Sequence, residues 1–144
     1  KAGHLARKQA RTRRLAEGMD VSKAPPVLQA KAAEMFPKAR TSIKAAYEAG
    51  VKIAFGTDAP AIPHGRNADE LVTLVEWGMS PAAVLKAATV TAAELINAGD
   101  RGRIAEGLLA DIIAVPGDPL SDITVTKNVN FVMKGGKVYV HQED

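Results

Sequence analysis

The segment from Val51 to Asp58 constrains the fold of this chain more than any other. It reads Val-Lys-Ile-Ala-Phe-Gly-Thr-Asp and is apolar on both faces of an extended chain, except at Lys52. Strands of this kind are typical of parallel sheets that are covered on both sides. Because such a strand needs neighbours on both edges, the pattern predicts a buried parallel strand over residues 51–55 within a larger α/β sheet.

The end of this strand is the first candidate for chemistry. Gly56 and Thr57 turn the chain and place the carboxylate of Asp58 where the strand stops. In a parallel α/β barrel, catalytic residues lie at the carboxyl ends of the strands. An aspartate there can bind a metal ion and accept a proton from metal-bound water. We therefore predict that Asp58 is a metal ligand and general base; the alternative is an aspartate that only caps a turn.

Helical patterns surround this strand. Apolar residues recur at helical spacing over residues 4–17, and again from the two prolines at 25 and 26 to a stop at Gly50. Pro37 predicts a kink or a short turn within the second of these helices. Gly99 is the predicted stop of the last helix. Three start signals follow the strand, and they are Asn67 with Glu70, Ser80 with Pro81, and Thr91 with Glu94.

From residue 100 onward the pattern changes to short strands. Residues 104–107 predict a strand and a turn, and residues 110–115 predict a second strand. Gly135 and Gly136 predict a two-residue hairpin turn, with strands over residues 131–134 and 137–141. The tail is therefore expected to be an antiparallel β unit, unlike the helix–strand–helix part before it.

Composition excludes several kinds of site. The chain has no cysteine, which excludes disulfides, thiolate metal sites and cysteine nucleophiles. No apolar run is long enough to span a bilayer, so we expect no membrane partner. Six cations precede the first acidic residue, but no aromatic residue lies among them to stack on bases. We therefore expect a solvated helix face and no nucleic-acid partner, with nucleic-acid binding as the weaker alternative. The six are Lys1, Arg7, Lys8, Arg11, Arg13 and Arg14.

In this order and spacing, the segments resemble the C-terminal portion of the amidohydrolase superfamily, metal-dependent hydrolases on a (β/α)8 barrel. Residues 50–58 resemble the eighth barrel strand with its metal-site aspartate. Residues 81–95 resemble the helix after the barrel, and residues 100–112 resemble the return into a small β-sandwich domain. Residues 117–123 and the hairpin are similar to that domain too. Within the superfamily, Pro63-His64-Gly65 and Asn67 resemble the imidazolonepropionase-like and prolidase-like branch.

The resemblance implies an α/β fold class. The chain would be a C-terminal fragment of a (β/α)8 TIM-like barrel, holding its last strand and surrounding helices, plus part of a small β-sandwich domain. Residues 1–99 would belong to the barrel and residues 100–144 to the small domain. The implied activity is hydrolysis of C–N bonds, prolidase- or carboxypeptidase-like, on dipeptides or N-acyl amino acids. The implied cofactor is a divalent metal, zinc, as one or two ions.

The loop after the strand supplies the other candidate site residues. His64 would contact substrate; the alternative is a histidine that is merely exposed to solvent. Arg66 would receive a substrate carboxylate, because a guanidinium matches a carboxylate in two-point geometry; the alternative is a surface arginine. Thr57 would orient Asp58 through a hydrogen bond, and Asn67 would either support the site in the same way or cap the following helix.

The histidines indicate that this chain does not hold a whole site. The superfamily takes a His-x-His pair from its first strand, whereas this chain has only His4, His64 and His141. We treat His4 and His141 as surface residues. We therefore expect an incomplete, inactive portion that needs the missing barrel portion of the same protein. Alternatives are a non-catalytic fragment that completes a partner chain, and a cyclic-amide hydrolase or imidazolonepropionase. A homo-oligomer also stays open, as do the cytoplasm and the periplasm, because the chain shows no targeting signal.

Overall fold

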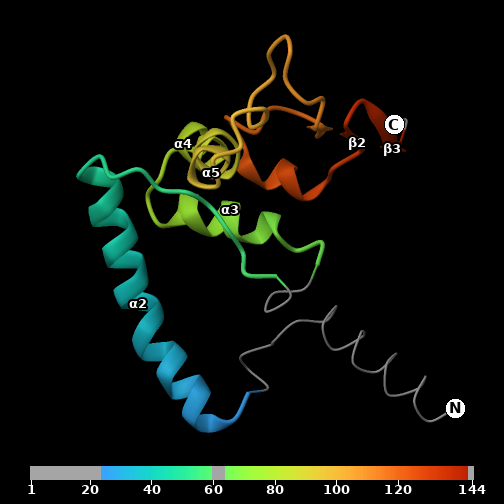
Figure 1. Ribbon diagram of the computed structural model, residues 1–144. Helices are drawn as coiled ribbons and strands as arrows, with labels where there is room; N and C mark the ends of the chain where they lie inside the picture. Colours follow the sequence, from blue (N-terminus) through green and yellow to red (C-terminus); the bar gives the residue numbers. More distant parts are fainter. Residues whose placement is uncertain (1–23, 60–63, 143–144) are drawn as a thin grey trace, which may run out of the picture.

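The computed structural model describes residues 24–59 and 64–142 (Figure 1). These residues combine helices with a small sheet, as expected for the α/β class. The predicted helix over residues 4–17 and the basic cluster lie outside them. In chain order the elements are α2 (Pro26–Glu48), α3 (Ala68–Glu76), α4 (Pro81–Ala88), α5 (Val90–Leu95), β1 (Ile112–Ala114), the 3-10 helix η2 (Ile123–Lys127), β2 (Phe131–Lys134) and β3 (Lys137–His141).

Helix α2 begins and ends as the sequence predicts. It starts at the prolines, and Pro37 lies inside one continuous helix, so the predicted kink or turn does not divide it. At its end, the N–H of Gly50 donates to the carbonyl of Tyr47 and the N–H of Val51 donates to that of Ala46, both at 3.0 Å. With Gly50 at φ 74°, these bonds form a Schellman motif.

The segment after α2 is extended, but the described residues do not pair it into the parallel strand that the sequence predicts over residues 51–55. The N–H of Phe55 donates to the carbonyl of Ala87 at 3.0 Å. No strand of the described residues lies beside the segment, because the three strands pair only with one another. Val51 is 57% exposed, although the pattern predicts that it is buried. A strand exists only with lateral partners, and residues 24–59 and 64–142 do not supply them.

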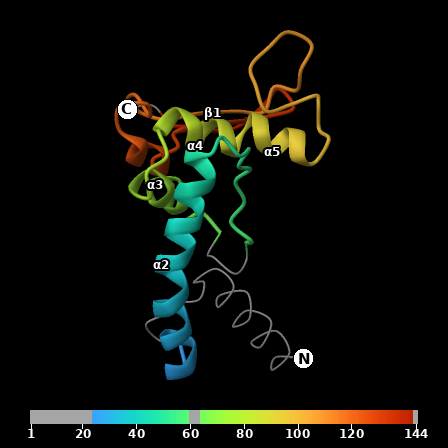
Figure 2. The same ribbon diagram turned by 90° about the vertical axis from the view of Figure 1, so that its left-hand side faces the viewer.

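A small apolar core lies around α3 and α4. Its buried members are Leu74, Met79, Val84 and Ala87, and the side chains packed against them include Ile43, Tyr47, Ile53 and Phe55. Helix α2 reaches this core only near its C-terminal end and has no buried residue, and its N-terminal part stands away from the other elements in two views (Figures 1 and 2). No described helix meets the combined length and hydropathy that a membrane span requires.

Local capping confirms one predicted helix start and corrects another. The Ser80 hydroxyl accepts from the N–H of Ala83 at 3.3 Å, as predicted for an N-cap before Pro81. The predicted cap at Thr91 is wrong, because α5 already begins at Val90. The predicted stop at Gly99 is wrong too. Asn97, at φ 55°, ends α5, since asparagine tolerates the left-handed conformation that glycine usually supplies.

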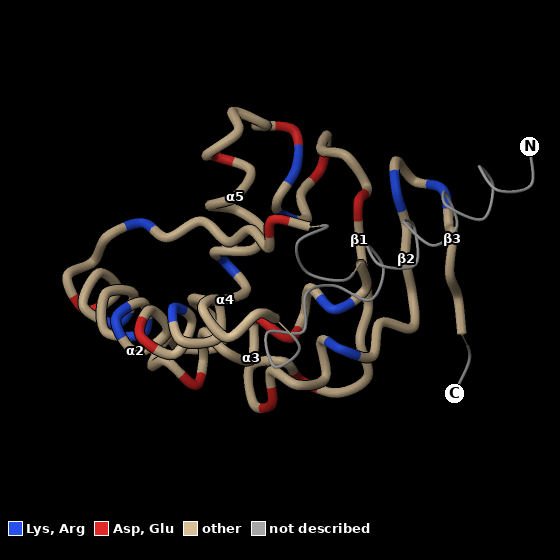
Figure 3. The backbone as a smooth tube through the Cα atoms, turned by 90° about the horizontal axis from the view of Figure 1, so that it is seen from below, with Lys and Arg blue, Asp and Glu red and all other residues tan. Residues whose placement is uncertain are grey.

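The C-terminal part forms an antiparallel sheet in the order β1-β2-β3, with the strands side by side in Figure 3. The predicted hairpin is confirmed. Gly135 and Gly136 have φ values of 55° and 77°, as a type I′ turn requires. The strand predicted within residues 104–107 is wrong, because only a turn forms there. Between β1 and β2, η2 buries Ile123 and Thr126 and contacts α3.

Gly102 lies in the turn after α5 and has no room for a side chain. Its φ is 91°, and a Cβ placed there would lie 2.8 Å from the Cβ of Ala93 and 2.9 Å from the carbonyl oxygen of Thr89. Gly99, three residues earlier, has no atom within 4 Å of the same position and no left-handed φ. The two glycines therefore form a matched pair.

We expect Gly102→Ala, in the complete protein, to lower the free energy of unfolding by about 2–5 kcal/mol. Left-handed backbone costs an L-residue about 1–2 kcal/mol, and overpacking costs about 1–3 kcal/mol more. Gly99→Ala is the control, with an expected change of at most about 1 kcal/mol. Denaturant unfolding of both variants measures the difference. Equally small losses would contradict the steric role of Gly102.

Candidate active site

Asp58 lies at the end of the extended segment, where the sequence places it. Its side chain is exposed, and its φ of 49° is left-handed, a conformation that aspartate tolerates better than most residues. Within the described residues, no hydrogen bond or ion pair engages its carboxylate. The carboxylate therefore keeps its oxygen lone pairs available, which suits a proton acceptor or a metal ligand; both roles stay predictions.

The side chain of Asn67 joins the turn before α3 to the end of the extended segment. Its Nδ2 donates to Thr57 Oγ1 at 2.9 Å, and its Oδ1 accepts from the N–H of Gly65 at 3.3 Å. The predicted capping role of Asn67 is therefore wrong: its backbone is helical, at φ −54° and ψ −34°, and its side chain caps nothing. Thr57 meets Asn67, whereas its expected bond to Asp58 does not form among the described residues.

Glu70 is the other half of the predicted capping box, and it also behaves differently. Its Oε2 is buried and has no hydrogen-bond partner in the part of the chain that the structure describes. Burial raises the pKa of the Glu70 carboxyl above its usual range, because desolvation disfavours the charged form. Buried polar atoms are normally hydrogen-bonded, so this oxygen is suited to a donor from outside the described residues. Sequence reasoning assigned Glu70 only a cap.

The carboxylate of Asp69 lies between two cations. Its Oδ2 accepts from Arg66 Nε at 2.7 Å, and its Oδ1 lies 2.9 Å from Lys127 Nζ. Hydrogen bonds from Lys127 and then Arg66 lower the pKa of Asp69. Arg66 belongs to the turn before α3, whereas Lys127 is the last residue of η2. The sequence offers no signal for this contact, because the partners are far apart along the chain.

The histidines of the described residues form no cluster of metal ligands with Asp58. His64 is exposed in the turn, next to Gly65 at φ 91°, and its predicted contact with substrate stays a prediction. His141 is exposed on β3, where its ring lies edge-on to Phe131 with centroids 5.7 Å apart. His4 lies outside the described residues. Residues 24–59 and 64–142 contain no group of three or more His, Cys, Asp or Glu that would hold a metal ion.

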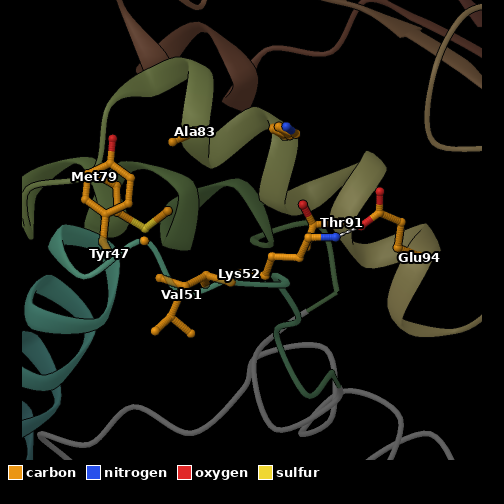
Figure 4. A pocket seen from close by; sticks show the side chains of 10 residues that line it. Tyr47, Val51, Lys52, Met79, Ala83, Thr91 and Glu94 are labelled. Atoms are coloured by element: carbon orange, nitrogen blue, oxygen red, sulfur yellow. Dashed lines mark hydrogen bonds and ion pairs between the residues drawn. The ribbon is translucent and has the colours of Figure 1, made fainter.

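A cleft of ≈ 270 Å³ lies at the other end of the extended segment (Figure 4). Inside it, Lys52 Nζ lies 2.9 Å from Glu94 Oε2, and this contact lowers the pKa of Glu94. Both side chains are more than half exposed, so the pair contributes little stability. Lys52, the cation in an otherwise apolar run, is the sequence signal for this cleft. Its lining is Tyr47, Gly50, Val51, Lys52, Ile53, Met79, Ala83, Lys86, Thr91 and Glu94, without Asp58 or His64.

Comparison with known proteins shows which family this chain resembles. The family model described as "Amidohydrolase family" matches residues 3–139. The ochratoxinase of Aspergillus niger is 44% identical over 100 residues, which are 65% of this chain and 20% of that protein. The solved structure of a Xaa-Pro dipeptidase with methionine in its active site is 44% identical, with a TM-score of 0.75 over 81% of this chain and 29% of that one.

A prolidase solved in complex with N-methylphosphonate-L-proline is 34% identical, with a TM-score of 0.74 over 83% of this chain and 30% of that one. The chain thus spans about a fifth of the curated relative's length and about three tenths of these structures. The resemblance to the prolidase-like branch of the superfamily is confirmed. Because the family model matches nearly the whole chain, this chain belongs to the amidohydrolase family.

Proposed function

We propose that the complete protein containing this chain hydrolyses C–N bonds of amides and peptides. Its substrates would be dipeptides of the Xaa-Pro kind or N-acyl amino acids. One observation carries this function. The chain matches prolidase and Xaa-Pro dipeptidase structures at 34–44% identity, and its extended segment ends on the carboxylate of Asp58, which no described residue engages. A carboxylate in such a place is suited to general acid–base chemistry.

In this mechanism, Asp58 takes a proton from the attacking water and delivers it to the leaving nitrogen. Its exposure and its freedom from hydrogen bonds within the described residues support the first transfer. The bond between Thr57 and Asn67 holds the backbone on which Asp58 stands against the turn that carries His64. His64 contacts the substrate from that turn. General acid–base catalysis of this kind contributes about 10²–10⁴-fold to a rate.

A divalent metal, zinc, as one or two ions, is part of the proposed function. When bound, such an ion lowers the pKa of a water molecule and polarises a carbonyl group. The described residues do not fit a complete metal centre, since they offer Asp58 without a group of three ligands. Asp58 would therefore be one ligand, and the others would come from outside the described part of this chain.

The architecture around Asp58 is proposed with the function. Residues 51–55 would be the last strand of a (β/α)8 barrel to which residues 1–99 belong. Residues 100–144 would supply strands to a small β-sandwich. Val51 is exposed, and residues 51–55 have no strand partner among the described residues, which supports their assignment to a barrel strand. The three-stranded antiparallel sheet supports the second. A homo-oligomer remains an alternative to a barrel that one chain completes.

Hydrolysis by the complete protein tests the proposed activity. A Xaa-Pro dipeptide, an N-acyl amino acid, a cyclic amide and an imidazolone would be compared at equal concentration. We expect release of the free amino acid from the first two. Turnover of a cyclic substrate alone would replace the dipeptidase assignment with one of the alternatives. No turnover of any of the four would favour a structural role.

Metal content gives a second test that does not depend on turnover. We expect the complete protein to retain stoichiometric zinc through extensive dialysis. The isolated 144-residue chain, whose described residues offer no ligand cluster, should retain none and show no turnover. Elemental analysis by plasma mass spectrometry measures this. Tight stoichiometric zinc together with hydrolysis in the isolated chain would contradict the incomplete-site reading.

A further inference from the structure

The charges of Arg66, Asp69 and Lys127, which meet where η2 lies against the start of α3, do not neutralise one another. Asp69 gives one oxygen to Arg66 and the other to Lys127, at 2.7 and 2.9 Å. Two cations share one anion, so the cluster carries one net positive charge. Oδ1 of Asp69 contacts Lys127 instead of Arg66, so Asp69 meets the guanidinium through one oxygen only. Arg66 is therefore held by a single contact and is not paired in the two-point manner of a closed ion pair.

Within the described residues, the rest of the Arg66 guanidinium has no partner. Nε makes the contact with Asp69, and within the described residues the two terminal nitrogens make no hydrogen bond or ion pair. The side chain is 67% exposed. A guanidinium carries five N–H donors in a rigid fork, and the edge formed by the terminal nitrogens matches a carboxylate. Fixing Nε reduces the rotamer freedom that the side chain would lose on binding.

This arginine stands beside the proposed catalytic residue. The bond of 2.9 Å between Asn67 and Thr57 joins the sequence neighbour of Arg66 to the sequence neighbour of Asp58. The turn that carries Arg66 is thus held directly against the end of the extended segment. Arg66 and the proposed catalytic residue therefore belong to two segments that are hydrogen-bonded to each other.

Building on the proposed function, we propose that Arg66 binds the free carboxylate of the substrate and that Asp69 and Lys127 are its positioning residues. The substrates selected are acids: dipeptides or N-acyl amino acids with an ionised C-terminus. Lys127, from η2, keeps Asp69 from closing a two-point pair with Arg66. Without Lys127, both Asp69 oxygens turn to the guanidinium and compete with the substrate.

The test compares N-acetyl-L-proline with N-acetyl-L-prolinamide, using the complete protein. Arg66→Met should raise KM for the acid by about 10–100-fold, since a hydrogen bond to a charged group contributes about 1.5–3 kcal/mol. The kcat for the acid and the KM for the amide should not change. Lys38→Met is the matched control, because Lys38 forms an exposed ion pair with Glu34 on α2. This variant should leave KM unchanged for both substrates.

Variants at position 127 test the positioning role. Lys127→Met should raise KM for the acid several-fold, and Lys127→Arg should restore it, because arginine also occupies an oxygen of Asp69. If Lys127 had only a structural role, its replacement would change KM for both substrates alike or for neither, since exposed ion pairs contribute little to stability. If Lys127→Met lost the preference for the acid and Lys127→Arg did not restore it, Lys127 would not be a positioning residue for Arg66.

Calorimetric binding of the same two compounds separates this inference from the proposed function. Suppose that the wild type hydrolyses the acid, but that Arg66→Met lowers the binding affinity for the acid and for the amide equally. The role of Arg66 is then overturned, and the hydrolase function stands. If neither compound is hydrolysed, yet the acid binds more tightly and Arg66→Met removes the difference, the function fails and the carboxylate site stands. Equal wild-type binding of acid and amide overturns the site.

Discussion

Replacing Asp58 with asparagine should reduce kcat of the complete protein by about 10³-fold or more, with little effect on thermal unfolding. General acid–base catalysis by one positioned group is typically worth about 10²–10⁴-fold, and the amide cannot accept the proton. The fold should tolerate the change for two reasons. No hydrogen bond among the described residues engages the carboxylate, and asparagine accepts the left-handed φ of 49° about as well as aspartate does.

Two variants make this result interpretable. Asp58→Ala removes the same carboxylate but places alanine in a left-handed conformation, so it should lose both turnover and about 1 kcal/mol or more of stability. Asp100→Asn changes another exposed aspartate, one that pairs with its neighbour Arg101, and should leave kcat unchanged. Steady-state kinetics and calorimetry measure both properties. Near-normal turnover in Asp58→Asn would remove Asp58 from the mechanism.

Expressed without the rest of its protein, the 144-residue chain should be oligomeric or partly molten. The buried apolar residues of the described part are only six in number, and α2 contributes none of them. Residues 51–55 have no strand partner among the described residues, and β1 and β3 are both edges of their sheet. Unpaired edges of this kind recruit other strands.

Sedimentation velocity and thermal unfolding of the isolated chain measure this outcome. We expect a broad size distribution and a shallow transition, whereas the complete protein should unfold in a steep, cooperative step. Coexpression with the remainder of the protein should restore that step if the missing surfaces are the cause. A clean monomer with a sharp transition would mean that residues 51–55 have found partners within this chain, contrary to the barrel proposal.

The features that sequence predicts correctly are those set by a few neighbouring residues. The hairpin turn at Gly135 and Gly136 needs two positive φ angles, and the stop at Gly50 needs one. The Ser80 cap needs an N–H three residues away. The end of α5 has two local candidates for a helix stop. The sequence favours Gly99, whereas Asn97 has the left-handed φ in the structure.

The features that it misses depend on residues far apart in sequence. A buried strand is a property of its neighbours, so the apolar pattern of residues 51–55 cannot reveal that the described chain lacks them. The same holds for the site. The position of Asp58 at the end of the extended segment follows from a local pattern, but the contact of Asp69 with Lys127 requires η2 to lie against α3. Asn67 fits a capping pattern, yet its side chain joins Thr57.

If Lys127 positions Arg66 as proposed, the C-terminal segment takes part in substrate choice as well as in folding. Consider a chimaera in which the segment after residue 99 comes from a relative. Here, an exchanged segment would bring its own residue to the end of η2, and with it a different partner for Asp69. A chimaera with the parental Asp58 and Arg66 would then differ in its preference for acids over amides, although no residue of its proposed catalytic end had changed.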